Sequence, residues 1–158
     1  MKETKRQIIE DDGTFPNNAA LPLVVAREVV SPDAGAAVFE ELFHRNYWRA
    51  AWRSGIFDFD HYHSTAHEVL GCFSGHAVLR LGGAVNQRVE LKAGDAMIIP
   101  AGVAHRCVSA QDFICVGAYP NGQVWDTCYG KAGERPAADE RIAALGPWEN
   151  DPLASPGV

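Results

Sequence analysis

Apolar and polar residues alternate through the middle of the chain, in short segments that glycine and proline separate. A period of two is typical of strands that bury one face, and glycine and proline mark the turns between them. The pattern predicts an antiparallel barrel or sandwich with a hairpin at Gly82-Gly83. Strands are expected at residues 47–53, 55–62, 67–74, 76–81, 86–91, 96–99, 104–109 and 112–119.

The first part of the chain has a different pattern. Residues 11–22 are rich in turn formers and predict an irregular arm, which leads into a short strand at 23–30. Ser31 offers a helix N-cap with a proline just after it, and apolar residues then recur at helical spacing. One amphipathic helix is therefore predicted at about 33–46, and residues 137–145 are a candidate for a second, short helix.

The length and composition favour one compact domain. The chain has 158 residues, which is enough for one well-filled core and too few for two ordinary domains. Apolar residues make up 47% and charged residues 22%, the balance of a globular protein. We expect one domain over residues 1–158, with an N-terminal arm and helix (1–46), a barrel core (47–120) and a C-terminal extension (121–158).

The charge of the chain excludes some partners. The net charge is −6, and Lys and Arg form no stripe, so binding to nucleic acid or to anionic lipid is not expected. The charged start is not followed by an apolar segment, and no run of residues has the length that spans a bilayer. A cytoplasmic protein that binds a small molecule is predicted.

The segment HYHSTAHE, residues 61–68, holds three of the six histidines. It does not match the helical zinc motif H-E-x-x-H, because Val-Leu-Gly follows His67-Glu68. The alternation that continues after it favours strands, on which His61 and His63 share a face. A turn at residues 64–66 then brings Glu68 back opposite these histidines, inside the barrel. A further ligand is expected from His105, which follows the turn at 100–102.

The neighbours of this cluster have plainer interpretations. His67 has the opposite strand parity to Glu68, so we expect it in the hairpin or on the outer face rather than at a metal. Phe57 and Phe59 share the parity of His61 and are expected to pack inside the barrel.

The four cysteines form no C-x-x-C pair, which argues against a zinc ribbon or a dithiol redox motif. Reduced and mostly buried thiols are expected. Cys72 and Cys107 share the inward parity of Glu68 and His105, and we interpret them as small apolar residues of the barrel wall. Whether His67, Cys72 or Cys107 takes part in the site stays open.

Two motifs in this region resemble those of the cupins. The first cupin motif reads G-x5-H-x-H-x4-E-x6-G, and its fixed positions are matched by Gly55, His61, His63, Glu68 and Gly75. The second reads G-x5-P-x-G-x2-H-x3-N, and it is matched by Gly94, Pro100, Gly102 and His105, with Ser109 in place of the final Asn. The arm, the HYHSTAHEVLG segment and GAYPNGQVWD also resemble the small bacterial cupins of the YjlB-like group, for which no reaction is known.

The resemblance implies an all-β fold, a double-stranded β-helix or jelly-roll barrel with an N-terminal arm and one flanking helix. It also implies one divalent transition metal, bound by His61, His63, Glu68 and His105. The position of Ser109 is not a ligand in the family, so that departure leaves the ligand set intact. The alternative is a metal-free barrel whose interior histidines bond to one another. Cupins commonly form homodimers, so a homodimer is expected.

Three imidazoles and one carboxylate suit Fe, Mn, Ni, Zn or Cu, so the ligands alone do not select the metal. In an octahedral shell they leave two positions, which a bidentate oxygen compound fits. We expect a metal-dependent enzyme of dioxygenase or isomerase type that acts on a small oxygenated metabolite. A non-catalytic metal or small-molecule binding module is the alternative, because one fold hosts both functions. The sequence identifies no separate catalytic residue.

Overall fold

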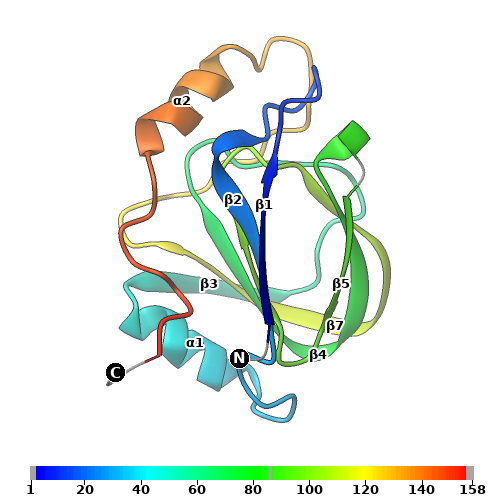
Figure 1. Cartoon of the computed structure of the whole chain (residues 1–158), viewed down its shortest axis with the longest axis vertical. Coiled ribbons are helices and arrows are strands. Elements are labelled where there is room, and N and C mark those ends of the chain that lie inside the picture. The colour runs from blue at the N-terminus through cyan, green and yellow to red at the C-terminus, as the bar shows by residue number, and fades with distance from the viewer. Residues whose placement is uncertain (1–2, 86, 156–158) are drawn as a thin grey trace.

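An antiparallel sheet dominates the structure, a computed structural model that describes residues 3–85 and 87–155. Within these residues the sheet has seven strands in the order β1-β2-β6-β4-β7-β3, with β5 paired to β4 (Figure 1). The predicted all-β fold is therefore confirmed. The strands are β1 (Glu3–Ile9), β2 (Asn18–Arg27), β3 (Trp48–Ser54), β4 (Glu68–Leu81), β5 (Gln87–Lys92), β6 (Ala96–Ile99) and β7 (His105–Pro120).

The two longest strands, β4 and β7, join segments that the sequence pattern separates. The first part of β4 lies between β6 and β7, and its second part lies between β5 and β7. The chain bends at Gly75, which has a φ of 63° and lies so close to β7 that a Cβ atom would be 2.1 Å from the carbonyl oxygen of Gln111. The predicted breaks near residues 75 and 110 are register shifts inside continuous strands.

Residues 55–62 do not form the predicted strand. They cross the edge of β7 as a loop, which pairs with that strand only where the Cys107 N–H donates to the Phe57 carbonyl (2.8 Å) and at a bridge between His61 and His105. Phe57 and Phe59 are 57% and 41% exposed, so the prediction that they pack inside the barrel is wrong. Their rings stack on each other at 4.8 Å outside the core.

The N-terminal region contributes more to the sheet than the predicted arm. Residues 18–22 belong to β2, which pairs with β6, and β1 adds an edge strand that the sequence pattern did not indicate. The predicted helix is confirmed as α1 (Ala36–Arg45), although it begins three residues late, because residues 31–34 form a turn closed by the Ala34 N–H and the Ser31 carbonyl (2.9 Å).

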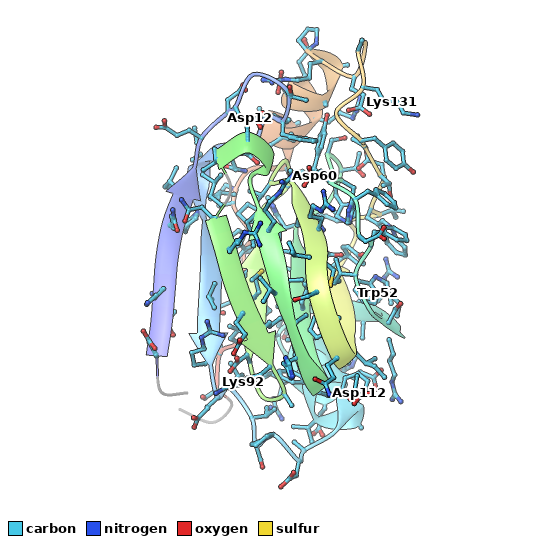
Figure 2. All side chains as sticks on the ribbon, turned by 90° about the vertical axis from the view of Figure 1, so that its right-hand side faces the viewer. Asp12, Trp52, Asp60, Lys92, Asp112 and Lys131 are labelled. Carbon is cyan, nitrogen blue, oxygen red and sulfur yellow. The ribbon has the colours of Figure 1, made fainter. Side chains whose placement is uncertain are left out.

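Both helices lie on the same side of the sheet (Figure 1). The candidate helix at 137–145 is confirmed as α2 (Ala137–Leu145). The chain after it runs along this side to the start of β3, where the indole N–H of Trp48 donates to the Asn150 carbonyl (2.8 Å). Figure 2 shows the opposite side, on which neither α1 nor α2 covers β5, β4 and β7. Neither helix in the described part of the chain is long and apolar enough to cross a membrane.

Candidate metal centre

Three histidines converge at one end of the barrel. His105 begins β7, and His61 is bridged to it by two backbone hydrogen bonds of 3.2 and 2.9 Å. His63 is held two residues further on, where its carbonyl accepts from the N–H of Gly102 (2.7 Å). One ring nitrogen from each histidine lies within 4.8 Å of the other two, and all three residues are buried. The predicted grouping of these histidines is therefore present in the structure.

A contact at Nδ1 orients each imidazole ring. The Nδ1 atoms of His61 and His105 lie 3.1 and 3.0 Å from the carbonyl oxygens of Phe59 and Val103, and Nδ1 of His63 contacts the carbonyl of Asp126. A carbonyl oxygen accepts only, so these contacts place the proton of each neutral ring on Nδ1. The lone pairs on the three Nε2 atoms are then free, which is the tautomer that a metal ion requires.

Glu68 is the first residue of β4, and it is buried, with 2% of the residue exposed. Its oxygens lie 3.5 Å from Nε2 of His63 and 3.3 Å from Nε2 of His105, although Glu68 stands outside the mutually close histidine group. The hydroxyl of Tyr119 donates to Oε2 at 2.7 Å, whereas the buried Oε1 has no hydrogen-bond partner among the described residues. A buried oxygen without a partner is costly unless a proton or a cation satisfies it.

The charges of this group follow from burial and from its neighbours. Burial lowers the pKa of His61 to about 3, and the nearby His105 adds to this effect, so the His61 ring is neutral. Burial alone raises the pKa of Glu68, but His63 and His105 outweigh it and hold that pKa well below its ordinary value. Burial opposes the charged form of His63 too, yet the Glu68 carboxylate raises the pKa of His63 above 6.5.

The donor set fits a divalent transition metal. Three imidazole nitrogens with free lone pairs and a carboxylate with one unsatisfied oxygen are ligands of borderline softness, which suit Fe, Mn, Ni, Cu and Zn. The buried histidine group is compatible with such an ion, and it does not identify which metal binds.

The site opens into a cavity of about 270 Å³. The ring of Trp52 forms one wall and lies across Gly117 of β7, where a Cβ atom would be 2.1 Å from the indole. Figure 2 shows Trp52 at the margin of the sheet, beside β7. The rings of Tyr119 and Trp125 stack at 4.6 Å, and Ile56 and Phe57 complete the apolar lining.

The C-terminal extension holds the segment that carries the histidines. The carboxylate of Asp126 accepts from the backbone N–H groups of Ser64 (2.6 Å) and Thr65 (3.2 Å), while its carbonyl orients His63. The Arg141 guanidinium of α2 donates to the Ser64 hydroxyl at 2.7 Å. Tyr119, Trp125 and Asp126 all lie in GAYPNGQVWD, but no spacing rule in the sequence assigned them to the site.

His67 is a buried structural residue. Its Nδ1 accepts from the N–H of Ala101 (2.9 Å), its Nε2 donates to the carbonyl of Gly146 (2.8 Å), and its ring packs against Trp148 at 5.3 Å. Both nitrogens are therefore used, and His67 points away from the histidine group as predicted. The C-terminal extension covers His67 through Gly146 and Trp148, a cover that the sequence pattern did not indicate.

The cysteines have no close contact with the histidine group. Cys72 and Cys107 belong to the hydrophobic core cluster inside the barrel, and all four cysteines are free thiols. The compact group of metal-binding atoms found in the described residues includes no cysteine. The predicted role of Cys72 and Cys107 as small residues of the barrel wall agrees with this packing.

Comparisons with known proteins agree with the geometry. A family profile for the Cupin domain matches residues 54–116, the segment that contains the three histidines and Glu68. A relative from Bacillus subtilis (strain 168), "Uncharacterized protein YjlB", is 39% identical over 153 residues, which cover 96% of this chain and 91% of the relative. The similarity therefore extends through the N-terminal strands and the C-terminal extension.

Proposed function

Because the chain belongs to the cupin family, in its YjlB-like group, we propose that it is a metal-dependent enzyme acting on a small oxygenated metabolite. His61, His63, His105 and Glu68 bind one divalent transition metal. The observation that supports this proposal is the histidine group itself. One ring nitrogen of each histidine lies within 4.8 Å of the other two, each Nδ1 contacts a carbonyl oxygen, and Glu68 beside the group has an unsatisfied carboxylate oxygen.

A bound metal supplies Lewis acidity or redox chemistry, which corresponds to an isomerase or a dioxygenase. The protein contributes orientation and exclusion of water. Tyr119 keeps Glu68 in place, and burial together with the Glu68 carboxylate raises the pKa of Tyr119, so its phenol stays protonated and donates a hydrogen bond.

A non-catalytic binding module is the second candidate, and one observation favours it. Among the described residues that line the cavity, the only titratable side chains are the four proposed ligands and Tyr119. Tyr119 donates to Glu68 and its hydroxyl accepts from the Trp52 indole (2.8 Å), so it is not free to act as a base. Catalysis would therefore depend on the metal-bound end of the cavity.

The first test is metal analysis of untagged protein purified without chelator. We expect about one transition metal per chain, and we expect re-addition of that metal at a hundredfold excess over its Kd to stabilise the metal-free protein by about 2.7 kcal/mol. For a chain of this size the melting temperature then rises by roughly 5–10 °C. Oxygen uptake with the iron or manganese form supports the enzyme. Absence of metal together with an unchanged melting temperature contradicts the proposal.

Metal affinity is expected to fall as the pH falls. His63 has a pKa raised above 6.5, so it binds a proton first and competes with the metal, whereas His61 stays neutral to about pH 3. Binding below neutral pH therefore displaces a proton from His63, and metal affinity declines as the pH falls through the raised pKa of His63. Calorimetry with Zn²⁺ in two buffers of different ionisation enthalpy measures this release. Binding that releases no proton at pH 6 would be inconsistent with the raised pKa of His63.

Asp126 is expected to act on the metal through His63. Removing its carboxylate in Asp126→Ala frees the backbone of Ser64 and Thr65, so the carbonyl that orients His63 loses its fixed position. Metal affinity is expected to fall about tenfold or more, the usual effect of losing a residue that orients a ligand. Asp139→Ala is the control, because that carboxylate of α2 pairs with Arg135. An equal loss in both variants would assign the effect to general destabilisation.

Two finer expectations remain proposals. We propose that the protein forms a homodimer and that it is cytoplasmic, as the family resemblance and the charge of the chain suggest.

A further inference from the structure

We propose that the cavity binds a compound whose metal-facing end carries adjacent oxygens and whose remaining part is an uncharged flat ring. This inference rests on the proposed function, since it concerns the ligand of the same site. The cavity of about 270 Å³ lies at the lower end of small-molecule pockets, which measure about 300–1,000 Å³, so a small ring compound fits it.

Aromatic rings with fixed orientations form the walls. Tyr119 and Trp125 stack with an angle of 8° between their planes, and the Trp52 indole N–H donates to the Tyr119 hydroxyl (2.8 Å). The donor of Trp52 and the hydroxyl of Tyr119 are therefore already used, and both residues offer mainly their ring surfaces to a ligand. Aromatic surfaces held in this way favour a flat ring, which gains contact area with little loss of conformational freedom.

The charges around the cavity disfavour an anionic tail. No Lys or Arg lines the cavity among the residues that the structure describes. Arg49 is near Tyr119, but its guanidinium donates to the Gln123 carbonyl (3.3 Å), and Arg49 is not among the residues that line the cavity. An anion buried without a cationic partner is costly. The polar side chains of the wall outside the proposed ligands and Tyr119 are Ser54 and Thr127, which are neutral.

The aromatic surface continues outside the cavity, next to Phe57. The ring of Phe57 meets His61 edge-on at 5.2 Å and stacks on Phe59, which contacts Tyr129 at 6.0 Å. Phe59 and Tyr129 are 41% and 46% exposed, which is unusual for large apolar side chains gathered in one place. Exposed aromatic rings thus adjoin the cavity through its lining residue Phe57, and they offer further apolar surface to a ring compound.

The test compares three probes: catechol, its disulfonated form tiron, and glycolate. Catechol combines a neutral ring with adjacent oxygens, tiron adds anionic groups to that ring, and glycolate has adjacent oxygens without a ring. Affinities are measured by calorimetry and ligand-observed NMR on chelator-treated protein, and catechol and glycolate are repeated on the Zn²⁺ form without oxygen. We expect catechol to bind at least tenfold more tightly than tiron to metal-free protein, and more tightly than glycolate to the Zn²⁺ form.

Trp125→Ala removes one ring of the wall. It is expected to weaken catechol binding about tenfold in both the metal-free protein and the Zn²⁺ form, while Zn²⁺ affinity and glycolate binding stay unchanged. Trp125→Phe is expected to restore most of the affinity. Tyr47→Ala is the matched control, because Tyr47 is exposed and lies outside the cavity lining. Preference for tiron or glycolate, or catechol binding that is insensitive to Trp125→Ala, would overturn the inference.

The two proposals can fail separately. Protein that takes up no metal but binds catechol in a manner dependent on Trp125 would contradict the proposed function and support the ring-binding cavity. Protein that binds Zn²⁺ and glycolate but not catechol would support the metal site and refute the inference that the cavity binds a flat ring.

Discussion

Replacement of His105 by alanine is expected to weaken metal binding by more than about a hundredfold. Loss of a residue that only orients a ligand costs about 10–100-fold, and His105 is proposed as a ligand itself. His105 is 1% exposed, its Nδ1 is fixed by the Val103 carbonyl, and its Nε2 lies 3.3 Å from Oε1 of Glu68, so its removal deletes one donor from the buried group. Titration of metal-free protein with Zn²⁺ against a competing chelator measures the loss.

His76→Ala is the matched control for this variant. His76 also lies in a strand of the sheet, but it is exposed and not part of the histidine group, so its removal is expected to leave Zn²⁺ affinity within about twofold. The ligand assignment fails if His105→Ala retains affinity within tenfold of the original protein. It also fails if His67→Ala loses the metal while His63→Ala keeps it.

The grouping of the site residues could be predicted from strand parity, because the direction of a side chain in a strand depends only on residue spacing. His61 and His63 are two residues apart, and Glu68, Leu70 and Cys72 alternate along one face of β4, so their inward direction follows from the period of two. The same rule failed for Phe57 and Phe59. The edge of β7 over residues 115–120 is already paired with β3, so residues 55–62 meet only the start of β7 and continue as a loop.

The contacts that orient the site are distant in sequence. Asp126 reaches Ser64 across 62 residues, and the Tyr119 hydroxyl reaches Glu68 across 51. No local period encodes such contacts. The strand β1 was missed for another reason: most of its side chains are exposed, and its charged residues are typical of edge strands that resist pairing with other chains, so it lacks a buried face to detect.

The second large effect is expected outside the barrel, where α1 packs on the sheet. Phe39 is fully buried in the cluster between α1, β4 and β7, and its ring lies 5.6 Å from that of Phe43. Phe39→Ala is expected to lower the free energy of unfolding by about 3–5 kcal/mol, because the ring is lost and a cavity is left. Urea unfolding measures this change. Metal affinity is expected to stay constant, since the ring faces the outer side of β4, opposite to Glu68.

Two further variants separate packing from helix propensity. Val38 precedes Phe39 on the same helix but is 41% exposed, so Val38→Ala is expected to change stability by less than about 0.5 kcal/mol.

A Cβ atom on Gly71 of β4 would lie 2.5 Å from the Phe39 ring, so Gly71→Ala is expected to destabilise the original protein. In the Phe39→Ala background that methyl group enters the vacated space, and the coupling is expected to be about 1–3 kcal/mol. Additive effects, or a loss below 1 kcal/mol for Phe39→Ala, would show that α1 is not packed against Gly71.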